Sequence, residues 1–558
     1  MVMYFPLLYS ETHYHLKYLY PLYFKREAEA LFDMPTRVLI KRTHNKIPIF
    51  LLIKDADKYP ISISEVCIVV FFKGNKKEFN IKEQTIVCNE SLRYYEFEID
   101  VVAEWINQHV SIVVEFKLNG TRYINDNFHG NVPHLFKVFI CDKEKVFPTG
   151  WYIGDTHYHS SFTSDQVEFG APLEMTKKIA KTMGLDWFFV TDHSYDLDDM
   201  IDDYTQQDHE HRKWNILKRE CHQLSDEETK IQFGEEVSVG NRLGQNVHLL
   251  SINYPNFMIG KGDSAEKWFQ NKPDIDLRML PINNTAITLS DSEEKKVQRD
   301  NIENMTLLIA AHPFEKIPYL QRKLLNRGNW SEMDFTDSKV EYLQIINGLS
   351  FFENLDLINK YFKLLLNGQK YYIVAGNDAH GNFQFMKQIQ IPFIKLMCRK
   401  QQLFGACFTA FQYENNNPIE GIKSKRIIIS NGPFLNFTIN YNEKKYHIGE
   451  SVHVYNHNKI TLQYEYLLET QRSTSHKQDK KNVENASIDN KAILQMIIGK
   501  INSKVIYKSK LDISTDRIEV LVDEESFVIL VLRTLDGHFA LTNPIWVNVS
   551  TDPVNDLF

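Results

Sequence analysis

Short apolar runs broken by turns dominate the first part of the chain. From about residue 36 to 141 these runs are R-V-L-I-K, I-P-I-F-L-L-I, E-V-C-I-V-V-F-F, Y-Y-E-F-E-I, V-S-I-V-V-E-F and F-K-V-F-I. Runs of this length that are rich in β-branched and aromatic residues predict strands, and a succession of them predicts a β-sandwich. We therefore expect an N-terminal β-rich domain over residues 1–149, in which residues 1–35 show no clear period.

After residue 150 apolar, strand-like runs alternate with charged, helix-like stretches. The clearest helical stretches cover residues 172–185 and 352–368. Because strands that alternate with helices are typical of a parallel sheet or barrel, we expect residues 150–424 to form an α/β barrel domain. Residues 253–305 interrupt this rhythm with a long polar stretch, which predicts either a surface insertion or a lid over the site.

A β pattern returns from about residue 425. Its apolar runs are R-I-I-I-S, F-L-N-F-T-I, I-T-L-Q-Y-E-Y, R-I-E-V-L-V and F-V-I-L-V-L. We expect a C-terminal β-sandwich domain over residues 425–558, interrupted by a polar loop that begins T-Q-R-S-T-S-H-K. A length of 558 residues agrees with a chain of several domains.

Charge and cysteine content narrow the classes of partner. A net charge of −8 gives no electrostatic reason to bind nucleic acid or an anionic membrane. No apolar run approaches the roughly 20 residues that span a bilayer, and the N-terminus lacks the basic region of a secretory signal. The six cysteines show no C-x-x-C spacing and are expected to be buried, reduced thiols. These features predict a soluble, cytoplasmic protein with a small-molecule partner and leave its oligomeric state open.

Histidine pairs separated by one residue occur three times. The tetrapeptide T-H-Y-H occupies residues 12–15 and again 156–159, and H-E-H occupies 209–211. Two such imidazoles can chelate one metal ion, yet a chain with 20 histidines in 558 residues should contain about one such pair by chance. Only the copy at 156–159 follows an apolar run, so we assign chemistry to His157 and His159. We interpret the other two pairs as surface or packing histidines.

Residue types that bind metals recur at the ends of the apolar runs between 150 and 424. In a barrel of alternating strands and helices, the carboxyl ends of the strands converge on the active site. A single histidine that closes a strand is more often structural, but several placed alike predict a metal site. The candidates are His157, His159, Asp165, His193, Glu235 or Glu236, His248 within its run, His312, Asp378 and His380.

These residues in this order resemble the polymerase and histidinol phosphatase (PHP) superfamily. The resemblance covers about residues 150–385 and rests on G-D-x-H-x-H-S with a downstream S-D, V-T-D-H, G-x-E-V, a strand histidine, A-H-P and G-x-D-A-H. It implies a distorted (β/α)7 barrel, here flanked by N-terminal and C-terminal β-sandwich domains. The lead-in G-W-Y-I-G-D, the dipeptide G-P in I-I-S-N-G-P-F, I-G-E-S at 448–451 and T-N-P-I-W at 542–546 are similar to the carbaryl-hydrolase-like branch.

The resemblance also implies three sets of metal ligands. The first set is His157, His159, Glu236 and Asp378. The second set is Glu236, His248 and His312, and the third is Asp165, His193 and His380. Glu236 is preferred over Glu235 because the family places its carboxylate two residues after the glycine, here Gly234. Gln166 and Asn377 depart from the family's usual residues without removing a ligand.

The ligand types predict hydrolysis with two or three divalent metal ions. Imidazoles mixed with carboxylates favour zinc, manganese or iron, since magnesium alone would want more oxygen ligands. Two ions bridged by Glu236 would lower the pKa of a shared water and so supply hydroxide near neutral pH. Asp155 and Asp192, each next to a ligand motif, are expected to orient imidazoles.

Three functions remain open at this stage. A phosphoesterase is favoured, because three ions can bind three phosphoryl oxygens. The resemblance to the carbaryl-hydrolase-like branch supports a carboxylic or carbamate ester hydrolase as the alternative. A metal-binding scaffold without turnover is a third possibility, because β domains flank the barrel, although an intact ligand set argues against it.

Overall fold

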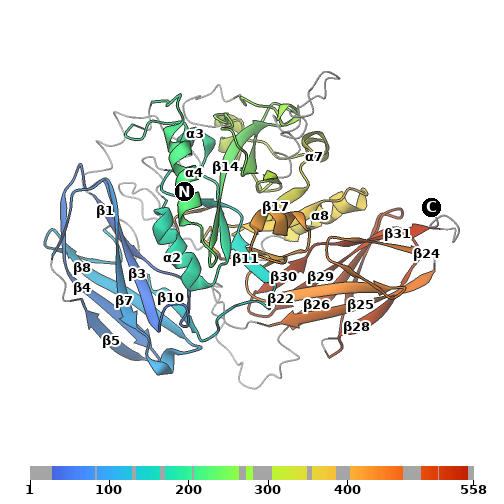
Figure 1. Cartoon of the computed structure of the whole chain (residues 1–558), viewed down its shortest axis with the longest axis horizontal. Coiled ribbons are helices and arrows are strands. Elements are labelled where there is room, and N and C mark those ends of the chain that lie inside the picture. Colours follow the sequence, from blue (N-terminus) through green and yellow to red (C-terminus); the bar gives the residue numbers. More distant parts are fainter. Residues whose placement is uncertain are drawn as a thin grey trace.

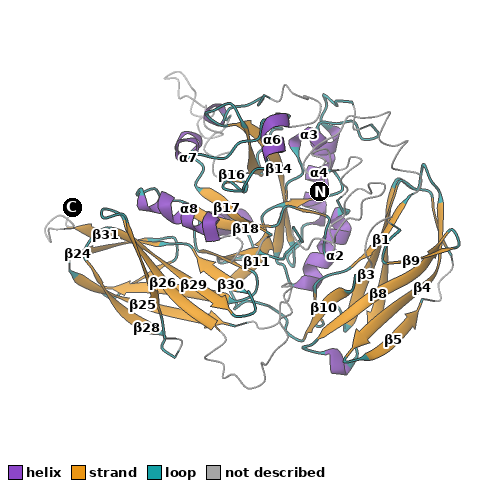
Figure 2. Ribbon diagram, turned by 180° about the vertical axis from the view of Figure 1, so that it is seen from behind, coloured by secondary structure: helices purple, strands orange, loops and turns teal. Residues whose placement is uncertain are grey.

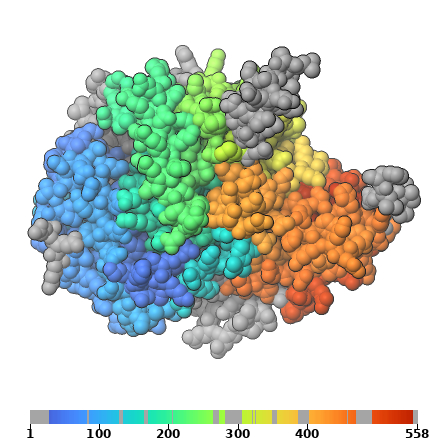
Figure 3. Space-filling model, in the orientation of Figure 1, coloured from blue at the N-terminus to red at the C-terminus, as the bar shows by residue number. Residues whose placement is uncertain are grey.

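The computed structural model of the chain describes most of residues 28–550. The described ranges are 28–81, 85–127, 134–163, 170–203, 206–262, 272–280, 305–348, 355–384, 402–455, 457–468, 492–512 and 514–550. N-terminal strands, a central mixture of strands and helices, and C-terminal strands follow one another across the molecule (Figure 1). In the space-filling view the central region contacts both of its neighbours (Figure 3).

Strands form most of the N-terminal region. They are β1 (Glu29–Asp33), β2 (Arg37–Leu39), β3 (Lys46–Lys54), β4 (Ile61–Phe72), β5 (Asn75–Asn80), β6 (Ile86–Cys88), β7 (Leu92–Asp100), β8 (His109–Leu118), β9 (Thr121–Ile124) and β10 (Phe136–Cys141), with the short helix η2 (Ala103–Trp105). One sheet has the order β1-β3-β7 and the other β2-β10-β8-β4-β5, with β6 beside β4 and β9 beside β8. Positions in β8 alternate between buried and half-buried, as expected for a strand with one face on a core. Phe32 and Phe116 join the two sheets through an edge-to-face ring contact of 5.2 Å.

The central region alternates strands with helices. Its strands are β11 (Trp151–Asp155), β12 (Tyr158–His159), β13 (Trp187–Val190), β14 (Lys230–Gly240), β15 (Asn246–Ile252), β16 (Leu307–Ala310), β17 (Tyr342–Asn347), β18 (Tyr372–Gly376), β19 (Ala379–His380) and β20 (Phe408–Gln412). Its helices are α2 (Leu173–Met183), α3 (Ser194–Leu197), α4 (Arg212–Leu224), η4 (Leu277–Met279), α6 (Tyr319–Leu324), α7 (Glu332–Ser338), α8 (Leu355–Leu366) and α9 (Pro418–Lys423). Strands β13, β15, β17 and β18 are buried along their whole length, as expected where both faces of a sheet are covered.

Seven of the central strands lie in one sheet in the order β11-β13-β14-β15-β16-β17-β18. The pairings β11–β13, β13–β14, β16–β17 and β17–β18 are parallel, and β15 is antiparallel to both of its neighbours. Spatial order therefore follows chain order. Among the described residues no ladder joins β11 to β18, so backbone hydrogen bonds do not close a barrel, and the (β/α)7 barrel stays a prediction.

Side chains and a short ladder connect the two ends of this run of strands. Thr156 and Thr409 donate hydroxyl hydrogen bonds to the carbonyl of Ala375, at 3.0 and 2.9 Å. Just beyond β11 and β18, strands β12 and β19 pair in parallel and bring His159 opposite His380. The carboxyl ends of the first and last strands of the run are thus held side by side.

The C-terminal strands extend the same sheet. They are β21 (Ile427–Ser430), β22 (Phe434–Tyr441), β23 (Lys444–His447), β24 (Ser451–Tyr455), β25 (Asn458–Leu467), β26 (Ala492–Lys500), β27 (Val505–Lys510), β28 (Arg517–Val522), β29 (Ser526–Thr534), β30 (Phe539–Thr542) and β31 (Ile545–Ser550). Beyond β11 the order continues β20-β21-β30-β29-β26-β27, while β23-β22-β25-β28 form a second sheet. Figure 2 shows β30, β29 and β26 leading away from β11. Because β20 pairs with β21 across residue 424, the predicted domain boundary does not separate two sheets.

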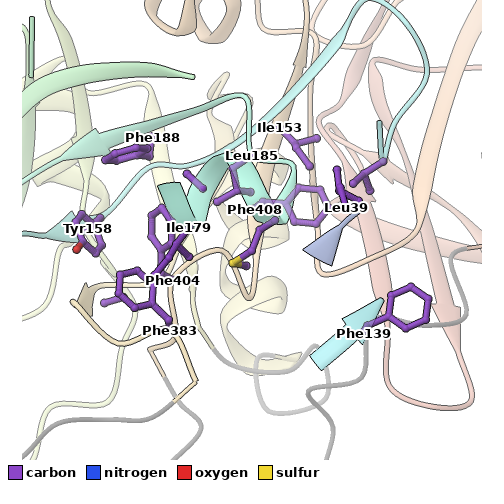
Figure 4. Packing of buried hydrophobic residues seen from close by; sticks show 14 of the residues in the cluster. Leu39, Phe139, Ile153, Tyr158, Ile179, Leu185, Phe188, Phe383, Phe404 and Phe408 are labelled. Carbon is purple, nitrogen blue, oxygen red and sulfur yellow. The ribbon is translucent and has the colours of Figure 1, made fainter. Parts of the chain in front are cut away.

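One hydrophobic core continues from the N-terminal strands into the central region (Figure 4). The ring of Phe147 lies 5.3 Å from that of Phe408 and 5.1 Å from that of Phe434, where the three regions meet. Gly184 ends α2 with a φ of 81°, and a Cβ there would lie 2.5 Å from Leu39 Cδ1. A side chain at Gly184 would therefore strain the backbone and push α2 away from the N-terminal region.

The described cysteines form no disulfide with one another, and they are buried as expected except Cys67, which is half-buried; Cys398 lies outside the described residues. None of the helices among these residues is long and apolar enough to cross a membrane. The predicted insertion follows β15 in the chain, and part of it lies beside β14, where Lys261 forms an isolated parallel bridge with Ser238. Residues 263–271 and 281–304, on which the lid interpretation depends, lie outside the described residues.

Candidate metal centre

Two histidine-bearing segments lie side by side beyond β11 and β18. His159 and His380 are partners in the β12–β19 ladder, and the backbone N–H of Asp378 donates to the carbonyl of His157 at 2.9 Å. Gly376 permits this approach, because a Cβ at this position would lie 2.7 Å from the Cβ of His157. The glycine of the G-N-D-A-H motif is therefore required by close packing around the first histidine.

Four ligand-type atoms meet next to these segments. The Nε2 atoms of His157 and His159 lie 3.0 Å apart. Glu236 Oε2, from β14, lies 3.1 Å from the first nitrogen and 3.2 Å from the second. Asp378 Oδ1 lies 3.3 and 3.0 Å from the same two nitrogens. All four side chains are at most 1% exposed, so these atoms share one small volume shielded from solvent.

The two oxygens of Glu236 face different sets of imidazoles. Besides the pair just described, Oε2 lies 3.3 Å from Nδ1 of His193. On the other side, Oε1 lies 2.5 Å from Nδ1 of His248 and 3.2 Å from Nε2 of His312. A carboxylate that bridges two metal ions needs this arrangement, because each oxygen must belong to a separate coordination shell.

Eight of the nine residues expected to bind metal lie in this cluster. In each of three sets, one ligand-type atom from every member lies within 4.8 Å of the others. The sets are His157, His159, Glu236 and Asp378; Glu236, His248 and His312; and His159, His193 and His380. The third set contains His193 and His380, as expected, and also includes His159 from the first set. Its remaining expected member, Asp165, lies outside the described residues.

Glu235 lies outside this cluster although it is equally buried. Its Oε1 accepts a hydrogen bond from the backbone N–H of Met258 at 3.2 Å. Successive residues of a strand point to opposite faces, so only one of the two adjacent glutamates can reach the histidines. The structure places Glu236 there. Burial raises the pKa of Glu235 well above its usual value and so favours the neutral carboxyl form.

The charged members of the cluster stabilise one another. Burial by itself would raise the pKa of Glu236, but His248 and His157 outweigh it and hold the pKa well below its usual range. Burial would lower the pKa of His159, but hydrogen bonds with Asp378 and Glu236 raise it to about 10. The two buried carboxylates thus require positive charge beside them, and divalent metal ions supply such charge.

His193 and His380 are buried imidazoles in which the neutral form is favoured, and a neutral imidazole is the form that binds metal. Burial lowers the pKa of both side chains, to well below the usual value for His193 and to about 3 for His380. Neither ring nitrogen of His193 makes a hydrogen bond to another described residue. Buried polar atoms are normally satisfied, so a neutral imidazole of this kind fits a metal ligand. The donor set of imidazole nitrogens and carboxylate oxygens fits zinc, manganese or iron.

Amide side chains hold two of the ligands in position. Gln344 Oε1 accepts a hydrogen bond from His157 Nδ1 at 2.8 Å, which leaves Nε2 facing the cluster. The other end of Gln344 donates to Asn347 at 3.1 Å. Asn347 and Gln402 donate to Oδ2 of Asp378 at 3.4 and 2.9 Å, which leaves Oδ1 for the cluster. These amides have no metal-ligand pattern in the sequence, although Asn347 ends an apolar run.

Asp155 and Asp192, expected to orient imidazoles, act on the chain segments that carry them. Asp192 accepts hydrogen bonds from the backbone N–H and the hydroxyl of Ser160, at 2.8 and 2.7 Å. Asp155 accepts from the backbone N–H of His157 at 3.1 Å and from the side chain of Asn377 at 2.6 Å. The described hydrogen bonds of both carboxylates go to groups other than imidazole rings, so their effect on the ligands is indirect.

The other histidine pairs differ from the one in the cluster. The ring of His211 stacks on Phe257 with 4.2 Å between centroids, and His209 is exposed. Neither belongs to a metal-binding set among the described residues, and their interpretation as packing and surface histidines stays a prediction. His13 and His15 lie outside the described residues.

Comparisons with known proteins assign no family. The chain matches neither a protein-family model nor a curated protein. Among solved structures, a β-glucuronidase of Parabacteroides merdae with glycerol in its active site shows a TM-score of 0.17 and 7% identity, covering 91% of this chain and 62% of that one. A calcium-binding mutant of Bacteroides uniformis β-glucuronidase 2 shows a TM-score of 0.15 and 10% identity, covering 94% and 61%. Structural similarity this low supports no inference about the fold or the activity of this chain.

Proposed function

We propose that this cluster is the active site of a PHP-type metal-dependent hydrolase that cleaves phosphoric esters. The observation that carries the proposal is Glu236, whose two oxygens face two sets of imidazoles at 2.5 to 3.3 Å. Two or three zinc, manganese or iron ions would be held by the eight clustered residues and Asp165. When bound, such ions lower the pKa of water and polarise the ester group under attack.

The protein's own residues orient the ligands and limit access to them. Gln344 fixes the ring of His157, and Gln402 fixes the carboxylate of Asp378. Burial keeps bulk water away from most of the cluster, because His312 is 9% exposed whereas the other seven members are at most 4% exposed. A substrate would therefore reach the ligands from the side of His312.

The number of ligand sets favours a phosphoester over a carboxylic or carbamate ester. A phosphoryl group presents three oxygens in addition to the ester oxygen, and three sets of ligands could bind one ion for each. A carboxylic or carbamate ester would need only two. A scaffold without turnover has no physical need for a bridging carboxylate with two separately oriented faces.

Metal reconstitution with a panel of esters tests the proposal. The protein is stripped with a chelator, reloaded with zinc, manganese or iron, and assayed on phosphomonoesters, phosphodiesters, cyclic phosphates, aryl esters and carbamates, with the metal content measured on each sample. We expect phosphoester hydrolysis that depends on the metal. His159→Ala should abolish this activity, and His453→Ala, at an exposed position of β24, should not. Retained metal with no ester hydrolysis would indicate a scaffold, and hydrolysis of aryl esters or carbamates alone would indicate the other class of ester.

A further inference from the structure

A small pocket adjoins the metal centre on the side of His248 and His312. It encloses about 70 Å³ and is lined by residues of β15, the segment after β16, α6 and residues 327–330. This is several times the roughly 10–15 Å³ of such space that one water molecule needs, so the pocket admits a phosphoryl group. Its charged lining groups, apart from the histidines, are Arg327, Lys316 and Glu315.

The buried guanidinium of Arg327 lies directly against a metal ligand. The side chain is in contact with Nε2 of His248 through Nη1, which also lies 3.4 Å from Nδ1 of the same ring. Arg327 is 6% exposed, and it bridges to Asn246 at the start of β15. The backbone N–H of Gly328 donates to the carbonyl of Asn246 at 2.8 Å. Backbone pairing to the strand that carries His248 therefore fixes where the guanidinium lies.

Arginine in this position suits a phosphoryl group. Its planar guanidinium presents several N–H donors in a fixed fork that matches two oxygens of a phosphate. Burial strengthens the attraction, because the local dielectric constant is lower than in water. Lys316 is exposed at the same pocket and adds positive charge there, whereas Glu315 is half-buried and lies 3.6 Å from His312.

We propose that Arg327 binds the terminal phosphoryl oxygens of the substrate in this pocket and thereby selects phosphomonoesters over uncharged esters. The inference rests on the proposed function and refines its substrate class. Lys316 assists at the mouth and is the less important of the two cations, since solvent screens its charge.

Substitution of Arg327 in the metal-loaded protein tests the inference. Arg327→Gln and Arg327→Lys are compared with Arg322→Gln, which removes an exposed guanidinium from α6. The probes are p-nitrophenyl phosphate, bis-p-nitrophenyl phosphate and p-nitrophenyl acetate, and calorimetry measures the binding of inorganic phosphate. Arg327→Gln should lower kcat/KM for the monoester roughly 10- to 100-fold and weaken phosphate binding by a similar factor. Arg327→Lys should recover part of the loss, and the control should change neither quantity.

A purely structural role for Arg327 gives a different result. If the guanidinium only supported the ring of His248, Arg327→Gln would lower the metal content or reduce the rates on charged and uncharged esters equally, and the inference would be wrong. If the wild-type protein cleaves no ester, the proposed function fails, and phosphate binding still decides the inference. An unchanged dissociation constant for phosphate in Arg327→Gln would then overturn it.

Discussion

The carboxylate of Asp33 accepts a hydrogen bond from the backbone N–H of Gln384 at 3.1 Å. The same carboxylate accepts another from the N–H of Phe383 at 3.2 Å. In return, the side chain of Gln384 accepts from the N–H of Lys137 at 2.8 Å and donates to the carbonyl of Pro35 at 2.9 Å. These contacts fasten the segment that follows β19 to the N-terminal strands, so the N-terminal region supports one side of the candidate metal centre.

Asp33→Ala is expected to weaken both the fold and the third ligand set. The substitution leaves three backbone N–H groups, those of Met34, Phe383 and Gln384, without this acceptor, which should lower the free energy of unfolding by about 1–3 kcal/mol. His380 lies three residues before Phe383, so its position should loosen and the metal content per chain should fall. Denaturant unfolding and elemental analysis measure the two effects. Asp57→Ala, at an exposed position of the same region, serves as the control, and an unchanged metal content would contradict the supporting role.

The two adjacent glutamates should respond very differently to substitution. Glu236→Ala removes the carboxylate that faces both imidazole sets, so metal binding should fall and the hydrolysis rate should drop by roughly three orders of magnitude. Glu235→Gln replaces a carboxyl group, favoured by burial in its neutral form, with an amide of similar shape, so the rate should stay within about twofold. Metal content, rate and thermal unfolding are measured on both variants. Equal losses of activity at unchanged stability would contradict the bridging role of Glu236.

Gln344 should set the metal affinity without binding metal itself. In Gln344→Ala the ring of His157 loses the acceptor that keeps Nε2 directed at the cluster. Loss of such a partner typically weakens metal binding 10- to 100-fold, and we expect a change of this order. Competition with a chromogenic chelator measures the affinity. Gln463→Ala, at an exposed position of β25, provides the baseline, and an affinity equal to this baseline would show that the ring is held by other contacts.

Cys407 should stay unreactive towards alkylating agents in the folded protein. Burial raises the pKa of this thiol to about 12 from an ordinary value of 9.0, so the reactive thiolate is scarce at pH 9. Mass spectrometry after iodoacetamide treatment should find Cys407 modified only once the chain is unfolded. The unfolded chain releases this proton first, so the contribution to stability is complete below about pH 9 and is lost as the pH rises towards 12. Rapid labelling of native Cys407 would contradict this assignment.

The local pattern of the sequence was informative about the ligands. His312 and Asp378, each two residues beyond the end of a strand, can be recognised from the apolar run before them, because strand ends gather at one edge of a sheet. Of the helices, α2 and α8 fall within the expected stretches 172–185 and 352–368. Short-range periodicity determines these elements, so a single sequence was enough to place them.

Long-range contacts were beyond the reach of the same analysis. Gln344, Gln402 and Arg327 carry no local signature, because their roles depend on the folded position of a partner 187, 24 or 79 residues away. The pairing of β20 with β21 across residue 424 was also missed. A change in the pattern of apolar and polar residues marks a turn or a helix such as α9. It does not show whether the strands on either side form one sheet.

The continuous sheet from β11 through β20, β21 and β30 to β29 has a consequence for how the chain can be cut or recombined. A fragment that ends at residue 424 would keep β20 and lose its partner β21. The exposed row of backbone N–H and C=O groups would then be free to pair with other molecules, which favours aggregation. If the strands after residue 424 were exchanged for those of another protein, β20 would likewise lose its partner β21. The metal centre is therefore best produced and altered within the intact chain, because the strands on both sides of residue 424 form one cooperative unit.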